Sequence, residues 1–249
     1  MRVVRNIGHV KRRKRLAKWS ALAGFAMLGS TFWLALNPKY IIIAYLPLLA
    51  GTIIFHYGMQ QVSRWNRNPR NDVLLDQRLQ HLGDKYSLIH YSQLGKRTVD
   101  HLLVHPAGVL VLTVRELPGK VTYRRGRWRK SGGGIGRLFG MGGPQLGSPT
   151  AETDVSVKTV EAFLADADYQ TDVDGVIVFV NPLAELDVEE PDYPVTNGEG
   201  LSDFIRTLAP DPGVRGGDTR ALTDLLSRGE ELEQPVRAPR RRPVRKRAA

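Results

Sequence analysis

Residues 97–121 constrain the fold of this chain more than any other stretch of its sequence. Two apolar runs meet at residues 106–108, and this pattern predicts two antiparallel strands joined by a tight turn. Asp100 interrupts the first run, and Thr113 and Arg115 stand near the end of the second. Strands are depleted in aspartate, and a buried carboxylate must be paired or bind a metal. We therefore expect Asp100 to have a specific role.

The turn predicts the register of this hairpin. If residues 106–107 form a two-residue loop, His105 pairs with Gly108. In the same register Asp100 lies opposite Thr113, and the second polar residue of the second strand shares their face because strand side chains alternate. A bulge at Gly108 would shift this register by one residue. The predicted polar patch is either a functional site or a cluster whose side chains satisfy one another at a sheet end.

The order of these motifs resembles the nuclease-related domain (NERD), a distant member of the PD-(D/E)XK nuclease superfamily. That family's pattern is an Ile-Asp-His start, an apolar run, a glycine, a Glu-x-Lys motif in a strand, and a Gly-Lys-Ile segment. The segments of this sequence that stand in the family's positions are residues 74–79, 99–101, 108–109, 111–115, 119–121, 148–150 and 176–180. The resemblance extends from residue 72 to residue 208 and implies a restriction-endonuclease-like fold.

The resemblance assigns roles to individual residues. Asp100 matches the invariant aspartate of the family, and Asp76 stands in for its helical glutamate. Thr113 replaces the glutamate of the Glu-x-Lys motif, and Arg115 replaces its lysine, whereas His101 matches. The resemblance thus implies vestigial catalytic positions, with two carboxylates left to bind a metal.

The two substitutions predict a loss of catalysis. Mg²⁺ prefers carboxylate and other oxygen ligands, and a threonine hydroxyl at position 113 is a neutral, weak one. Arg115 keeps a positive charge for a phosphate but does not release its proton, so it cannot act as a base. We expect either no cofactor or, if the site is active, Mg²⁺ held weakly by Asp100 and Asp76. In an active enzyme the missing acid would come from elsewhere, with Glu152 in the following helix as one source. Glu116 is adjacent, but strand alternation points it to the other face.

A basic turn at residues 124–130 surrounds one tryptophan, and a glycine-rich stretch follows at residues 132–136. The stretch lacks the Gly-Lys-Ser/Thr ending of a nucleotide-binding P-loop. The turn is either a solvated hairpin tip, a contact for anionic headgroups, or a nucleic-acid site using charge and stacking. The candidate phosphate- or nucleic-acid-binding residues are Arg115, Lys120, Arg124, Arg125, Arg127, Trp128, Arg129 and Lys130.

Residues 19–36 and 40–59 form two apolar runs without Asp, Glu, Lys or Arg. Each is close to the roughly 20 residues that a helix needs to cross a bilayer. A signal peptide is disfavoured because a second run follows at once, and a buried soluble hairpin is disfavoured because neither run has a polar face. Basic residues flank both outer ends, which predicts two transmembrane helices with both termini in the cytoplasm. We expect a multi-pass protein of the inner or plasma membrane.

The net charge of +11 belongs to the two ends of the chain. The head at residues 1–18 carries +8 and the tail at residues 237–249 carries +7, so the remainder carries −4. Such arms beside a membrane favour anionic lipid headgroups first and nucleic acid second, and we expect both to be disordered. The chain has no cysteine, so disulfides and thiol chemistry are excluded.

We predict an α/β fold in which a mixed central sheet has flanking helices, preceded by two transmembrane helices. The expected divisions are a basic cytoplasmic arm (1–18), a transmembrane hairpin (19–59), a linker (60–71), a nuclease-related domain (72–210), a linker with a terminal helix (211–236) and a disordered tail (237–249). The region of about 150 residues is long enough for one core.

Three functions follow from these patterns. The first is a membrane-anchored, catalytically degenerate nuclease-related domain that binds DNA, RNA or other phosphate groups. The second is an active Mg²⁺-dependent nuclease with a migrated acid. The third is a non-enzymatic membrane scaffold whose basic arms bind anionic lipid. The sequence names no protein partner.

Overall fold

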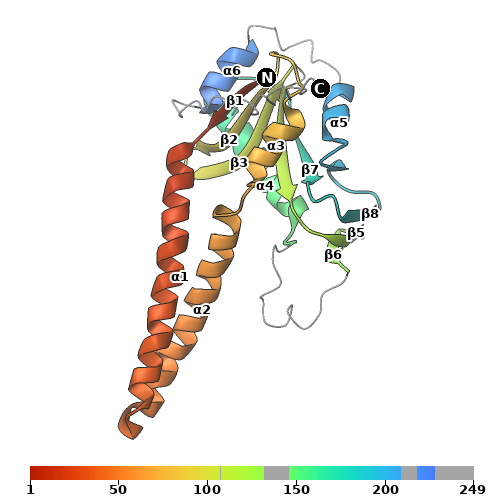
Figure 1. The fold of residues 1–249 in the computed structure, drawn as a ribbon. Coiled ribbons are helices and arrows are strands. Elements are labelled where there is room, and N and C mark those ends of the chain that lie inside the picture. The colour runs from red at the N-terminus through yellow and green to blue at the C-terminus, as the bar shows by residue number, and fades with distance from the viewer. Residues whose placement is uncertain (107, 132–145, 209–217, 228–249) are drawn as a thin grey trace, which may run out of the picture.

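The computed structural model describes residues 1–106, 108–131, 146–208 and 218–227. Figure 1 shows an α/β domain from which two long helices extend to one side. The elements in chain order are β1 (Arg2–Arg5), α1 (Ile7–Ala35), the 3-10 helix η1 (Pro38–Tyr40), α2 (Ile41–Trp65), α3 (Asn71–Leu79), β2 (Ser87–Leu94), β3 (Arg97–His105), β4 (Gly108–Arg115), β5 (Gly119–Arg124), β6 (Arg127–Lys130), α4 (Pro149–Asp166), β7 (Val173–Phe179), β8 (Ala184–Val188), β9 (Val195–Asn197), α5 (Leu201–Thr207) and α6 (Asp218–Ser227).

The main sheet is mixed, as the sequence predicts. Its strand order is β1-β2-β3-β4-β7-β9. The strands β2, β3 and β4 pair antiparallel, whereas β1 pairs parallel with β2, and β7 pairs parallel with β4 and β9. The central strands β4 and β7 are nearly continuous apolar runs because both of their faces are covered.

Helices cover both faces of this sheet, and each face has its own apolar core. On one face α4 and α6 contribute Val157, Val160, Leu164, Leu222 and Leu226. On the other face α3 and α5 contribute Leu75, Leu79, Leu201 and Ile205. The two clusters place the sheet between two helical layers, so the flanking helices predicted from the sequence are confirmed.

The predicted hairpin register is confirmed next to the turn. His105 pairs with Gly108, and the ladder continues without a bulge to the pair Leu102 and Val111, where it ends before the predicted pair of Asp100 and Thr113. Gly108 has φ +125°, and a Cβ there would lie 2.4 Å from the carbonyl oxygen of Asp172. Glycine is therefore required both by the backbone conformation at this position and by the close approach of the segment that contains Asp172.

A second, smaller sheet has the order β6-β5-β8. Its strand β8 lies within residues 181–194, a stretch whose acidic composition predicts a loop. The strand forms because Leu186 packs against a small core that includes Val121 and Phe179, while β8 pairs parallel with β5. Tertiary packing therefore overrides the local preference of an acidic segment.

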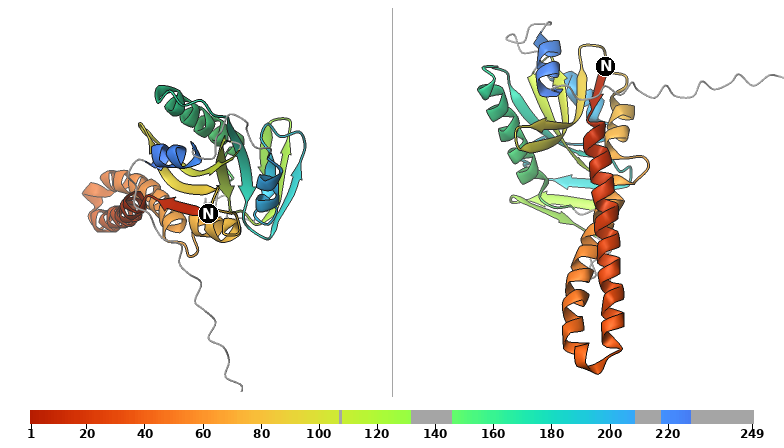
Figure 2. Two further views of the ribbon diagram at one scale, coloured as in Figure 1. Left: turned by 90° about the horizontal axis from the view of Figure 1, so that it is seen from above. Right: turned by 90° about the vertical axis from the view of Figure 1, so that its left-hand side faces the viewer.

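The helices α1 and α2 pack along each other and extend away from the sheets (Figure 2). Buried residues recur at a spacing of seven along this contact: Val10, Ala17 and Gly24 in α1, and Ala44, Gly51, Gly58 and Trp65 in α2. A Cβ at Gly24 would lie 2.3 Å from the backbone nitrogen of Phe55, and one at Gly58 would lie 2.3 Å from that of Ala21. Small residues thus let the two backbones approach closely, as in many membrane helix pairs.

Of the two predicted membrane spans, one is supported. Within the described part of the chain, the helical segment Pro38–Trp65 alone is long and apolar enough to cross a membrane, with 17% of its apolar window buried. The other run lies in α1, whose first half carries the cations of the head. Its uncharged part is short and contains Ser20, Ser30 and Thr31, so its apolarity is lower.

The N-terminal head is ordered, contrary to the expectation of a disordered basic arm. Residues 2–5 form β1, whose Val3 and Val4 are buried, and residues 7–35 form one continuous helix. The expectation failed because composition shows the charges of the head but not the apolar pair that joins it to the sheet. Residues 60–65, expected in a linker, belong to α2. The predicted disordered tail and the glycine-rich stretch lie outside the described residues.

Candidate functional site

A groove of about 1110 Å³ lies between the helical hairpin and one end of the main sheet. Its walls come from α1, α2, β3, β4 and the first turns of α4. Three of the predicted site residues line it, namely Asp100, Thr113 and Arg115. The fourth, Asp76, is not among its lining residues. The hairpin therefore brings together the residues that the sequence placed on one patch, but α3 does not join them.

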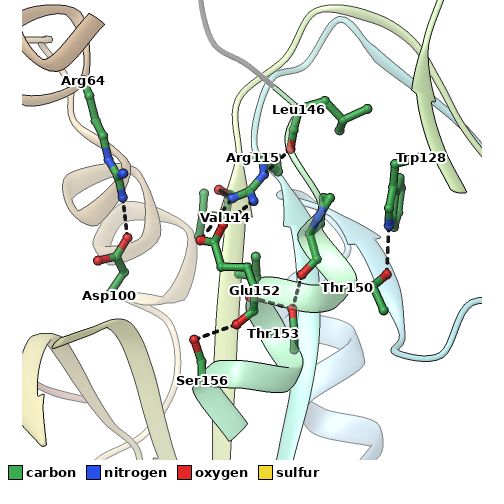
Figure 3. A network of polar contacts seen from close by, with 12 residues as sticks. Arg64, Asp100, Val114, Arg115, Trp128, Leu146, Thr150, Glu152, Thr153 and Ser156 are labelled. Atoms are coloured by element: carbon green, nitrogen blue, oxygen red, sulfur yellow. Dashed lines mark hydrogen bonds and ion pairs between the residues drawn. The ribbon is translucent and has the colours of Figure 1, made fainter. Parts of the chain in front are cut away.

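Asp100 is neutralised by an arginine of α2. Its Oδ2 lies 2.5 Å from Nη2 of Arg64 in a pair that is largely open to water, with 34% and 58% of the two side chains exposed. Figure 3 shows this pair on one side of the view, apart from the group around Arg115. Asp100, which matches the invariant aspartate of the family pattern, thus forms an ion pair with Arg64 of the same chain.

Thr113 is buried, and its hydroxyl contacts another hydroxyl. The oxygens of Thr113 and Thr153 lie 2.7 Å apart, and Thr153 also donates to the carbonyl of Pro149 at 2.9 Å. This contact joins β4 to the start of α4. The geometry gives Thr113 a packing role at the position where the family pattern has a metal-binding glutamate.

Arg115 is held on three sides. Its Nη2 lies 2.6 Å from Oε2 of Glu152, its Nε donates to the carbonyl of Leu146 at 2.9 Å, and its Nη1 donates to that of Val114 at 3.1 Å (Figure 3). Glu152 lies in the first turn of α4, where the helix dipole stabilises a negative charge. These three contacts fix the orientation of the Arg115 guanidinium, while half of the Glu152 side chain is exposed to solvent.

A third arginine–carboxylate pair joins Arg67 to Glu116. Glu116 is buried, and its Oε2 has no hydrogen-bond partner among the described residues. In a regular strand the side chains of Arg115 and Glu116 would point to opposite faces. The strand β4 ends at Arg115, however, and both side chains line the groove. The three carboxylates of the groove, including those at positions 100 and 152, each face an arginine.

Asp76 belongs to a separate, buried network. It pairs with Arg5 of β1 and accepts from His90, whose Nε2 lies 2.9 Å away. Arg5 Nε also lies 2.8 Å from Oδ2 of Asp72, and Arg70 reaches the same carboxylate with two nitrogens, at 2.7 and 3.0 Å. The ion pair between Asp76 of α3 and Arg5 of β1 thus joins two elements that are far apart in the sequence.

Burial and pairing shift the pKa values within this network. Burial opposes ionisation of Asp72, but the hydrogen bonds from Arg70 and the charge of Arg5 outweigh it and lower its pKa to about 2. Burial lowers the pKa of His101 to about 3, with a smaller contribution from His90. The Nδ1 atoms of His90 and His101 lie 2.8 Å apart, so one ring donates and the other accepts.

This arrangement does not fit a Mg²⁺ site. Such a site needs carboxylate oxygens that converge on one point. Among the residues that the structure describes, no group of three or more His, Cys, Asp or Glu residues could hold a metal ion. Asp76 and Asp100 lie in different networks, and each already pairs with an arginine.

The basic turn of the sequence forms the β5–β6 hairpin, and none of its predicted binding residues lines the groove. Trp128 packs against Tyr123 and Phe179, with ring centroids 4.7 and 5.7 Å away, and donates to the hydroxyl of Thr150 at 2.8 Å. This half-buried tryptophan therefore packs against the small sheet, and its stacking on a base stays a prediction.

The cations of this hairpin fall into two groups. Lys120 and Arg124 pair with Asp187 of β8, at 3.0 and 3.4 Å. The side chains of Arg125, Arg127 and Arg129 are exposed. Lys130, also a predicted binding residue, is half-buried. The exposed charges form a separate cationic edge, and Figure 1 places β5 and β6 at the lower right of the domain, across from the helical hairpin at the lower left.

Sequence reasoning missed four arginines of the groove, namely Arg64, Arg67, Arg70 and Arg97. In the sequence the first three are basic residues that follow an apolar run, and Arg97 begins a predicted strand. Arg67 and Arg70 lie beyond the end of α2 at Trp65, and Arg64 lies in its last turn. No pattern in the sequence shows that this turn faces the end of β3.

Residues 70–180 match the family model described as the nuclease-related domain (NERD). The matched region runs from the start of α3 to the end of β7 and includes the groove residues of β3, β4 and α4. No curated protein and no solved structure matches the chain. The fold is a mixed α/β fold, and this region of it resembles a nuclease-related domain.

Proposed function

We propose that this protein is a membrane-anchored nuclease-related domain that binds phosphate groups in its groove without hydrolysing phosphodiesters. The observation that carries this proposal is the pairing of the groove's acids with arginines. Asp100, Glu116 and Glu152 each face a guanidinium. An arginine that holds a carboxylate can exchange it for a phosphate, because both present planar pairs of oxygens to the same fork of donors.

Membrane anchoring is supported by the outer surface of the helical hairpin. Large apolar side chains are exposed on the helical hairpin, including Phe25, Phe32, Ile42 and Leu46, which are 64–82% exposed. Such a surface is far larger than soluble monomers usually tolerate. In our proposal both helices cross the inner or plasma membrane, and the cations before and after them keep both termini in the cytoplasm.

The loss of hydrolysis is supported by two positions. A nuclease of this kind needs a metal held by fixed carboxylates, which activates water and neutralises developing charge. Thr113 supplies no charge, and Arg115 does not release a proton. The loss of one electrostatic or acid–base contribution typically lowers the rate by roughly 10²–10⁴-fold. Together the two changes should leave no measurable cleavage.

The test uses the whole chain in nanodiscs with labelled DNA and RNA, in Mg²⁺ and in Mn²⁺. We expect weak binding at low salt, release near physiological salt and no cutting, because phosphate contacts are screened by salt. The variant Thr113→Glu with Arg115→Lys restores the family's acid and base, and any gain of cutting would show that the remaining site is intact. Cutting by the unmodified chain that disappears in Asp100→Ala would contradict the proposal.

An active nuclease with a migrated acid is the second candidate, and Glu116 favours it. Its buried Oε2 has no hydrogen-bond partner within the part of the chain that the structure describes, and Glu116 lines the same groove as Asp100 and Glu152. If this candidate is correct, Glu116→Gln and Glu152→Gln each abolish metal-dependent cutting. If neither cutting nor binding occurs, the scaffold function remains, in which the basic segments hold the domain at anionic lipid.

A further inference from the structure

The groove joins two surfaces of different chemistry. One wall is apolar and comes from the helical hairpin, where Leu28, Phe55 and Met59 line it. The other end is cationic and comes from the last turn of α2 and from the two central strands of the NERD-like region. The arginines that line the groove are Arg64, Arg67, Arg70, Arg97 and Arg115. A single cavity therefore runs from the apolar surface of the hairpin to a set of guanidinium groups.

The charges of the groove favour an anion. Five arginines line it, against the three carboxylates Asp100, Glu116 and Glu152. Arg97 is exposed and has no ion-pair partner among the described residues. Two of the carboxylates, Asp100 and Glu152, keep 34% and 50% of their side chains exposed, so they can turn to solvent when a stronger anion arrives.

We propose that this groove binds an anionic phospholipid, with the phosphate at Arg97 and Arg115 and the acyl chains along Phe55 and Met59. The inference rests on the membrane anchor of the proposed function and names the phosphate compound that the groove takes. The cavity volume of 1110 Å³ is near the upper end of ligand sites, which are about 300–1,000 Å³. The headgroup and upper chains of one lipid fill such a space.

The apolar wall of the groove favours a lipid over other compounds that carry a phosphate. A free phosphate is polar throughout and gains nothing from Leu28, Phe55 and Met59, and a nucleic acid finds only Phe55 among them as an aromatic surface for base stacking. A phospholipid buries its chains there at roughly 0.8 kcal/mol per CH₂ group. The exposed apolar residues of the same helices, such as Ile42 and Ile53, continue this surface away from the groove. A lipid in the groove thus lies against a surface that is continuous with the anchor.

The experiment measures fluorescent phosphatidylglycerol binding to the whole chain in detergent micelles. We expect saturable binding, and phosphatidylcholine, which has no net charge, should bind at least tenfold more weakly. Arg97→Gln and Arg115→Gln should each weaken binding about tenfold, since one charge-assisted hydrogen bond corresponds to about that factor. The matched control Arg206→Gln changes an exposed arginine that pairs with Asp203 on α5, outside the groove, and should leave binding unchanged.

A second variant tests the exchange of partners. Glu152→Gln removes the carboxylate that holds Arg115 and should strengthen phosphatidylglycerol binding, a gain that misfolding cannot produce. Glycerol phosphate and short RNA are added as competitors. If glycerol phosphate displaces the lipid at equal concentration, the site recognises the phosphate group alone and not the acyl chains. If RNA displaces it, the groove is a nucleic-acid site. Either result overturns the inference, as does equal binding by the groove variants and the control.

Alkaline extraction of cell membranes distinguishes this failure from failure of the anchor. A chain that stays in the membrane but shows no groove-dependent lipid binding contradicts the lipid site alone. A chain that is released by the extraction contradicts the membrane anchor, on which the lipid site depends.

Discussion

Arginine–carboxylate pairs occur in two regions of this molecule, and their surroundings differ. In the network around Arg5, the side chains of Arg5 and Asp72 are 7% and 0% exposed. In the groove, Arg64 and Asp100 are 58% and 34% exposed. The same chemical contact therefore has two uses. Buried, it fixes elements to one another, whereas near solvent it contributes little to stability and leaves its arginine available for another anion.

The difference follows from the cost of leaving a charge without its partner. In the buried network the loss of one carboxylate leaves a guanidinium that water cannot reach. At the Arg64–Asp100 pair of the groove water replaces the lost partner, and salt screens what remains. The two carboxylates at positions of the family pattern thus differ in their surroundings, since Asp76 belongs to the buried network and Asp100 to the solvent-open pair of the groove.

The largest expected effect is that of Asp72→Asn. The variant leaves Arg70 without a full negative charge and Arg5 with Asp76 as its acidic partner, so we expect the free energy of unfolding to fall by about 3–5 kcal/mol. Urea denaturation of the whole chain in detergent, followed by tryptophan fluorescence, measures it. Asp203→Asn, in an exposed pair on α5, is the control and should not shift the midpoint. A shift equally small for Asp72→Asn would show that the buried network does not hold the fold.

A smaller effect is expected from pH. The pKa of His101 falls from the ordinary 6.5 to about 3 in the folded protein, so the unfolded chain binds the proton first. Stability is therefore full above pH 6.5 and is lost as the pH falls toward 3, by at most about 1.4 kcal/mol per unit. His101→Asn keeps a hydrogen-bonding side chain beside His90 and should flatten the stability profile between pH 6 and about 4. An unchanged slope would assign the acid sensitivity to other groups, such as His105, whose pKa is also lowered by burial.

The smallest effect is expected from Asp100→Asn. Because Asp100 and Arg64 are open to water, the variant should change the free energy of unfolding by less than about 1 kcal/mol. The comparison with Asp72→Asn under identical conditions is the measurement. A loss of about 1.5–3 kcal/mol would mean that Asp100 is a structural acceptor and that the two regions do not differ in kind.

The sequence predicts the local parts of the fold well. The register from His105 to Leu102 follows from a two-residue turn, and the shared groove of Asp100, Thr113 and Arg115 follows from strand alternation. Both depend on residues close in the chain. The match of residues 70–180 to the nuclease-related domain agrees with the order of motifs.

The contacts between distant segments were not predictable in this way. Arg5 and Asp76 are 71 residues apart, and nothing in either neighbourhood shows that they pair. The expectation that Asp76 joins Asp100 failed for this reason, since a helix can supply its acid to either side of a sheet end. The pairing of Arg64 with Asp100 likewise depends on where α2 ends relative to β3.

One feature of the fold sets how forces reach the domain. A single residue, Asn6, separates the strand β1 from the helix α1, and its side chain accepts from the backbone nitrogen of His9 at 2.8 Å. The helix therefore continues the edge of the main sheet as a stiff rod of 29 residues. If a bilayer holds the other end of that rod, a change in bilayer thickness or helix tilt is transmitted to the sheet as a lever movement.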